Sequence, residues 1–231
     1  MGKPVYGVTL NSVKEKCSFT ETASCPRHKF HVGGIIKNMT EGFNENTIEP
    51  DMYVNKNRIL FKTVHGSHLY GLNHASSDLD YYVVVEDSGK HHFKTKQTIV
   101  DGVDSTVIGY NAFMENCFKG VPQALEAMFS DKATIDEFGA LRQAYKAGGS
   151  SVTDVYLRTI FNFSRDGRRG GLKYKKHAVR LALNLNSILE SERFNPTLNV
   201  NEIKLVTDMH VLPQEEFEKK LNSVSLIQIF S

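Results

Sequence analysis

The run HGSHLYGLNHASSDLDYY, residues 65–82, brings together glycine, serine and aspartate residues that could handle a phosphate. It overlaps the end of RILFKTVHG, whose Ile, Leu, Phe and Val content predicts a strand that ends at the glycine. A helical turn that begins there would present free backbone N–H groups, which suit a phosphate. Gly66 would let the phosphate approach the backbone, and Ser67 would add a hydroxyl donor. The pattern predicts a phosphate-binding turn at these two residues.

Two carboxylates stand at the other end of the same run. Asp78 and Asp80 are two residues apart at the head of LDYYVVVED, which has the composition of a strand. Strand alternation would put both carboxylates on one face. Hard divalent cations prefer oxygen ligands, and two such ions can hold the attacking and the leaving oxygen in an in-line phosphoryl transfer. The spacing predicts a site for Mg²⁺ or Mn²⁺ with two ions.

A third carboxylate on a neighbouring strand would complete this site and could accept the proton of an attacking hydroxyl. The segment DGVDSTVI offers Asp101 and Asp104. We prefer Asp104 because it opens its strand as the other two aspartates open theirs. Ser-Ser-Asp before a strand is also ordinary turn chemistry. The combination of Gly-Ser, the aspartate pair and a later acid at this spacing favours a site over a simple turn.

Basic residues cluster later in a chain whose formal net charge is only +2. In LKYKKHAVRLALNLNSILES, residues 172–191, apolar positions repeat at spacings of three and four, which predicts a helix. Lys173, His177 and Arg180 share one stripe of that helix. They could clamp a triphosphate or a nucleic-acid backbone, although a solvated helix face is the usual origin of such a stripe.

A second group of potential metal ligands lies near the N terminus, namely Cys17, Cys25, His28 and His31. Their spacing fits no standard zinc finger, so independent thiols and imidazoles are the favoured interpretation and a structural zinc is the alternative. His65 and His68 are interpreted as packing or orienting groups rather than zinc ligands. The odd total of three cysteines argues against a disulfide scaffold and for a reducing cytoplasm.

The elements that must position these residues form a small mixed sheet with few helices, followed by a helical half. Strands are predicted at 58–66, 79–87 and 104–110, with a weaker strand or hairpin arm between 91 and 100. Residues 135–147 have the pattern of an amphipathic helix. We expect an α/β (α+β) fold with three parts: an N-terminal extension over 1–57, a core with flanking helices over 58–146, and a helical subdomain over 152–231.

The composition of the whole chain is that of a globular protein. Of its 231 residues 40% are hydrophobic and 23% are charged, and no apolar run reaches 18 residues. The first residues lack the apolar core of a signal peptide. We therefore expect no membrane association and a cytoplasmic location. The small net charge gives no general indication of a nucleic-acid partner.

The motif HGS-x10-DLD, followed by an aspartate on a later strand, resembles the signature of the DNA polymerase beta-like nucleotidyltransferase superfamily. The segment KGVPQALEAMF and the pattern Lys-x-x-x-His-x-x-Arg-Leu at 173–181 are similar to a bacterial and phage branch of predicted nucleotidyltransferases, some of them associated with RNA repair. The resemblance covers roughly residues 58–190. Its central motif is specific to the superfamily rather than to a substrate.

The resemblance implies a Mg²⁺-dependent transfer of a nucleoside monophosphate from an NTP such as ATP to an acceptor, with pyrophosphate leaving. By position, Gly66 and Ser67 would contact the triphosphate, Asp78 and Asp80 would bind metal, and Asp104 would be the third acid. The same resemblance supports contacts from the Lys173–His177–Arg180 stripe. This chain differs from the family in the length of sequence before the glycine and in the valine of KGVP.

The acceptor stays open at this point. An RNA 3′ end is favoured by the family branch, while a protein hydroxyl, as in AMPylation, and a small molecule are alternatives. Two further hypotheses come from other functional classes. One is a nucleotide-binding protein without transferase activity, and the other is a zinc-stabilised interaction protein built on the N-terminal cluster.

Overall fold

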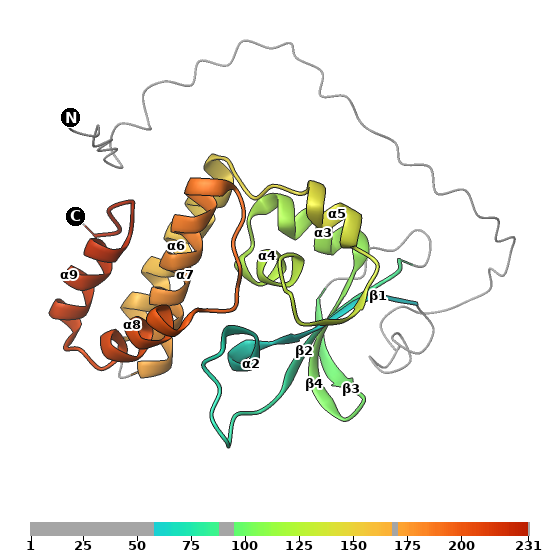
Figure 1. Ribbon diagram of the computed structural model, residues 1–231, viewed down its shortest axis with the longest axis horizontal. Helices are drawn as coiled ribbons and strands as arrows, with labels where there is room; N and C mark the ends of the chain where they lie inside the picture. The colour runs from blue at the N-terminus through green and yellow to red at the C-terminus, as the bar shows by residue number, and fades with distance from the viewer. Residues whose placement is uncertain (1–57, 88–94, 168–170, 231) are drawn as a thin grey trace, which may run out of the picture. The chain divides into compact units, whose positions relative to one another are not determined.

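The computed structural model describes residues 58–87, 95–167 and 171–230 (Figure 1). The predicted N-terminal extension and its four potential zinc ligands, Cys17, Cys25, His28 and His31, lie outside the described residues. The zinc hypothesis therefore stays a prediction.

In the described residues, five strands form one mixed sheet in the order β3-β4-β2-β1-β5 (Figure 1). They are β1 (Ile59–His65), β2 (Asp80–Val85), β3 (Lys96–Val100), β4 (Val103–Gly109) and β5 (Ala133–Asp136). β2 and β4 pair in parallel, and the other three pairs are antiparallel. The three strong strand predictions are confirmed by β1, β2 and β4, and the weaker segment contains β3.

The predicted helix over 135–147 is partly wrong. Residues 133–136 form β5, which pairs with β1, and the shorter helix α5 (Gly139–Ala144) follows. The free edge of β1 offers backbone donors and acceptors, and a strand at this position satisfies them. Strand pairing with a distant segment thus overrides the local helical pattern.

The helices of the described chain begin and end close to recognisable signals. Besides α5 they are α2 (Gly66–Tyr70), α3 (Tyr110–Lys119), α4 (Pro122–Met128), α6 (Ser150–Gly167), α7 (Leu172–Ser191), α8 (Val200–His210) and α9 (Gln214–Val224). Pro122 opens α4, where its missing N–H costs no hydrogen bond. Asn199 and Glu202 form a capping box at the start of α8. The bounds of α7 coincide with the helix predicted from the apolar repeat.

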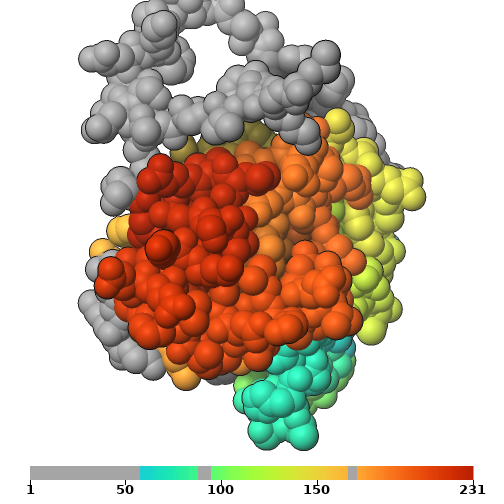
Figure 2. Space-filling view, turned by 60° about the vertical axis from the view of Figure 1, so that its left-hand side comes forward, coloured from blue at the N-terminus to red at the C-terminus, as the bar shows by residue number. Residues whose placement is uncertain are grey.

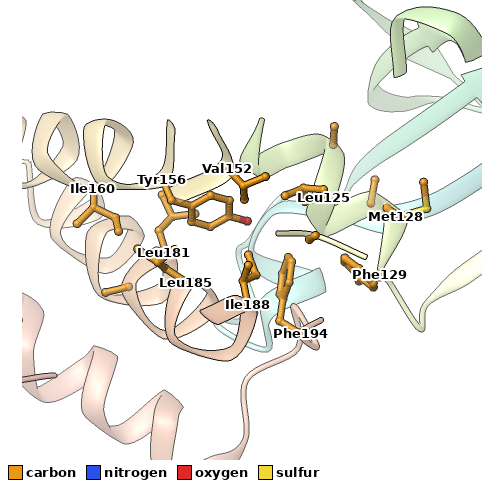
Figure 3. Packing of buried hydrophobic residues seen from close by; sticks show 14 of the residues in the cluster. Leu125, Met128, Phe129, Val152, Tyr156, Ile160, Leu181, Leu185, Ile188 and Phe194 are labelled. Atoms are coloured by element: carbon orange, nitrogen blue, oxygen red, sulfur yellow. The ribbon is translucent and has the colours of Figure 1, made fainter. Parts of the chain in front are cut away.

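The larger of two hydrophobic clusters in the described residues joins one face of the sheet to the helices. Figure 3 shows its centre, where α4, α6 and α7 meet. The side chains there include Leu125, Met128, Val152, Tyr156, Ile160, Leu181, Leu185 and Ile188. The fold class is confirmed as a mixed α+β structure with a small sheet and a helical C-terminal half. Because this core draws on both predicted parts, the division into a core and a helical subdomain stays a prediction.

The C-terminal helices form a large part of one face of the molecule (Figure 2). Figure 2 shows the C-terminal helices α7 to α9 on one face, with the segment that follows α2, in teal, projecting below them. None of the helices in the described part of the chain is long and apolar enough to cross a membrane.

Candidate active site

A cleft of about 710 Å³ opens at one end of the sheet. Its lining comes from four strands, four helices and one connecting segment. These are the end of β1, the start of β2, the strands β3 and β4, the helices α2, α4, α7 and α8, and the segment leading to β2. Seven of the eight predicted site residues line it, namely Gly66, Ser67, Asp78, Asp80, Asp104, Lys173 and His177. Their lining of one cleft agrees with the predicted grouping, while their roles stay predictions.

Strand register brings two carboxylates together. Asp80 and Asp104 are direct register partners in the parallel pair β2 and β4. Register partners on neighbouring strands, about 4.8 Å apart, point to the same face of a sheet. Asp80 is also the register partner of His65 at the end of β1. Asp78 precedes β2 and is exposed, so it enters the cleft from the connecting segment rather than from the strand.

The structure separates the two candidates for the third acid. Asp101 lies in the turn between β3 and β4 with a φ of 53°, and its Oδ2 is 2.5 Å from Nζ of Lys62. It does not line the cleft, whereas Asp104 does. Asp104 therefore lies in the cleft beside Asp80, and its role as the third acid stays a prediction.

The turn at Gly66 has a backbone that only glycine adopts easily. Its φ is +62°, and a Cβ added there would lie 2.6 Å from Oδ2 of Asp80. α2 begins at Gly66, after His65 in an extended conformation, so the predicted helical turn is confirmed. The missing side chain thus lets the Asp80 carboxylate lie directly against the backbone of the turn.

The donor set has the chemistry that Mg²⁺ or Mn²⁺ requires, because it consists of carboxylate oxygens that line the cleft. Within the described ranges, however, no three His, Cys, Asp or Glu side chains are arranged as a metal-binding group. Asp80 and Asp104 are paired by the sheet, while Asp78 stands on the connecting segment. The two-ion site stays a prediction.

The wall of the cleft that α7 provides is basic. Lys173 and His177 line the cleft there, as does Lys176. Burial first, and then the charges of Arg180 and Lys173, lower the pKa of His177 to about 3. Burial also lowers the pKa of His65. Both imidazoles are therefore neutral at physiological pH, so the lysines carry the positive charge of this wall.

Arg180, the eighth predicted site residue, does not line the cleft. Only 4% of it is exposed, its Nη1 pairs with Oε1 of Glu126, and its guanidinium lies 3.7 Å from the ring centroid of Tyr70. The stripe on α7 therefore runs from the cleft into the interior. Its last member, Arg180, pairs there with the carboxylate of Glu126.

Sequence reasoning missed several residues at this site. Glu126, fully buried on α4, carried a usable signal, because it is a lone acid among the apolar residues of ALEAMF. Gln97, Thr106, Gln123 and His210 also line the cleft. Their positions depend on strand pairing and helix packing, and isolated polar residues give no pattern from which this could be predicted.

The neutral His177 predicts a pH-dependent stability. Its pKa in the folded chain, about 3, lies below the ordinary value of 6.5, so unfolding is accompanied by proton uptake in acid. This contribution to stability is fully present above pH 6.5 and is lost as the pH falls towards 3. We expect the His177→Gln variant to lose about 2 kcal/mol less than the unchanged protein between pH 6.5 and 4.5. Urea unfolding at a series of pH values measures this, and parallel pH profiles would contradict it.

Comparisons with known proteins add little to this geometry. No family model matches the chain, and no curated protein matches it. Among solved structures, the chain is similar to the crystal structure of a nucleotidyltransferase-like protein from Exiguobacterium sibiricum 255-15. The identity is 11%, the match covers 78% of this chain and 70% of the other, and the TM-score is 0.31. A TM-score this low does not establish a shared fold.

Proposed function

We propose that this protein is a nucleotidyltransferase that moves a nucleoside monophosphate from an NTP to an acceptor hydroxyl and releases pyrophosphate. The observation that carries the proposal is the pairing of Asp80 with Asp104 in parallel register beside the Gly66 turn. Lys173 on α7 supplies a positive charge in the same cleft. Nucleotidyl transfer requires carboxylates at the reacting centre and a positively charged side chain along the phosphates.

In this reaction the residues of the cleft have separate roles. The Ser67 hydroxyl and the Lys173 ammonium bind the phosphates of the NTP. Asp104 accepts the proton of the acceptor hydroxyl, whose oxygen forms the new bond to the α-phosphorus. The bond from that phosphorus to the bridging oxygen breaks, and its electron pair leaves with pyrophosphate. Mg²⁺ or Mn²⁺ held by Asp78, Asp80 and Asp104 would neutralise the charge that develops on the phosphates.

For the acceptor we propose an RNA 3′ end first. Tyr174, 42% exposed, stands between Lys173 and Lys176 at the start of α7. Positive charge interleaved with an exposed aromatic ring is a common arrangement in surfaces that bind single-stranded nucleic acid. A protein hydroxyl or a small molecule remains the alternative acceptor.

A second candidate function is nucleotide binding without transfer. One observation favours it: within the part of the chain that the structure describes, no three potential ligands form a metal-binding group. Such a protein would bind an NTP in the same cleft and act as a sensor or a partner of another protein.

Incubation of the full chain with each labelled NTP and Mg²⁺ tests the proposal. The acceptors are tRNA, other RNA and a cell extract, and the readout is label in RNA or in protein. We expect label transfer to RNA. Label in protein would replace the RNA acceptor by a protein hydroxyl, and NTP binding without transfer would favour the second candidate. If no NTP binds or is consumed, both functions are wrong.

A further inference from the structure

The strongest unassigned feature of the molecule is the fully buried carboxylate of Glu126 on α4. Its Oε1 accepts a hydrogen bond from Nη1 of Arg180, and its Oε2 accepts one from the Tyr70 hydroxyl at 2.7 Å. Nε2 of His65 lies 3.8 Å from the same Oε2. One side chain therefore contacts residues of three other elements, α7, α2 and the end of β1.

Each of these three elements also contributes residues to the lining of the cleft. On α7, Arg180 follows His177 by three residues and Lys173 by seven, so all three lie on one stripe. Holding the guanidinium in the interior helps to fix the rotation of α7 about its axis, together with the buried apolar residues of the helix. That rotation turns Lys173 and His177 towards the cleft, which they line.

The contact with Tyr70 acts on α2 in the same way. Tyr70 ends this five-residue helix, whose first residues are Gly66 and Ser67. The two carbonyl groups before Tyr70 are held as well, because Nζ of Lys132 donates to the oxygens of His68 and Leu69 at 2.7 and 3.0 Å. α2 is thus attached at its carboxyl end, where Glu126 accepts the hydrogen bond of the Tyr70 hydroxyl.

We infer that Glu126 is a positioning residue: it sets the distance and orientation between the Gly66–Ser67 turn and the Lys173–His177 wall. Arg180, predicted from the sequence to bind nucleotide, acts through this carboxylate. The consequence for ligand binding rests on the proposed function. A triphosphate has to touch both walls, so it depends on their separation, whereas a monophosphate can bind to one of them.

A role in folding alone has to be separated from a role in positioning. Removing one member of a buried ion pair leaves an unpaired buried charge, which destabilises any protein. Removing both charges together often preserves the fold. The informative variant is therefore the double substitution Glu126→Gln/Arg180→Met, which keeps the approximate size of both side chains and removes both charges.

A matched control exists on the far side of β1. Nη1 of Arg142 lies 2.8 Å from Oδ2 of Asp136, the two side chains are 19% and 28% exposed, and neither residue lines the cleft. Asp136→Asn/Arg142→Met removes this pair in the same way. Both double variants are made in the full chain and compared by thermal unfolding and by affinity for an NTP and for the corresponding NMP.

We expect the Glu126/Arg180 variant to unfold cooperatively and to bind the NTP at least about tenfold more weakly, with a smaller change for the NMP. The control variant should keep both affinities. If the folded Glu126/Arg180 variant binds the NTP as tightly as the unchanged protein, the inference is overturned.

Amide hydrogen exchange tests the same inference without nucleotide. Exchange in residues 67–72 and at the start of α7 should rise in the Glu126/Arg180 variant and stay unchanged in α9 and in the control variant. Unchanged exchange in α2 would overturn the inference. An unchanged protein that binds no NTP, combined with raised exchange in α2, would refute the proposed function and leave the positioning role supported.

Discussion

The Asp80→Asn variant is expected to lose at least about 10³-fold in nucleotide transfer while keeping its fold. Asparagine has the shape of aspartate but not its charge, so the variant cannot balance a divalent cation beside the phosphates. Asp80 occupies the position where β2 meets the Gly66 turn, and it is paired in register with Asp104. Transfer of labelled NMP at saturating Mg²⁺, together with thermal unfolding, measures both effects.

A matched pair of variants gives this prediction its control. Asp104→Asn should lose activity to a similar extent, because Asp104 lines the cleft beside Asp80. Asp101→Asn should keep it, since Asp101 pairs with Lys62 outside the cleft. Asparagine also tolerates the positive φ of position 101. Equal transfer in the Asp101 and Asp104 variants would remove the basis for assigning the third acid to β4.

The local sequence pattern predicted the three strands that position the site residues. The strands β1, β2 and β4 have β-branched and aromatic runs. Gly66 follows the first run, and Asp80 and Asp104 stand at the beginning of the other two. Their meeting at one end of the sheet follows from the antiparallel pairing of β1 with β2 and the parallel pairing of β2 with β4. The sequence indicated that the acids belong on neighbouring strands, and the register supplies the rest.

In the helical half, the local sequence pattern predicted the bounds of a helix but not the contacts of all its side chains. The apolar repeat of α7 predicted its bounds, and the stripe correctly put Lys173 and His177 on one side. The fate of Arg180 depends on α4, more than fifty positions earlier, because a buried acid there accepts its charge. Periodicity along one helix does not contain that information, so the same stripe has both cleft-lining and interior members.

The Gly66→Ala variant is expected to lose transfer activity nearly as completely as Asp80→Asn, for a steric reason. Alanine at a φ of +62° costs about 1–2 kcal/mol of backbone strain. Its Cβ would also lie 2.6 Å from the Asp80 carboxylate oxygen, so that carboxylate has to move. The strain lowers stability, and the displacement of Asp80 lowers activity.

Gly102→Ala separates these two effects. Gly102 has a φ of +77°, and nothing lies within 4 Å of a Cβ built there, so alanine at this turn brings the strain without the collision. We expect similar losses of stability in the two variants, measured by urea unfolding, and a loss of NMP transfer only in Gly66→Ala. If both variants keep full transfer, the contact between the turn and Asp80 has no part in the reaction. If both lose it equally, backbone strain rather than the position of that carboxylate accounts for the effect.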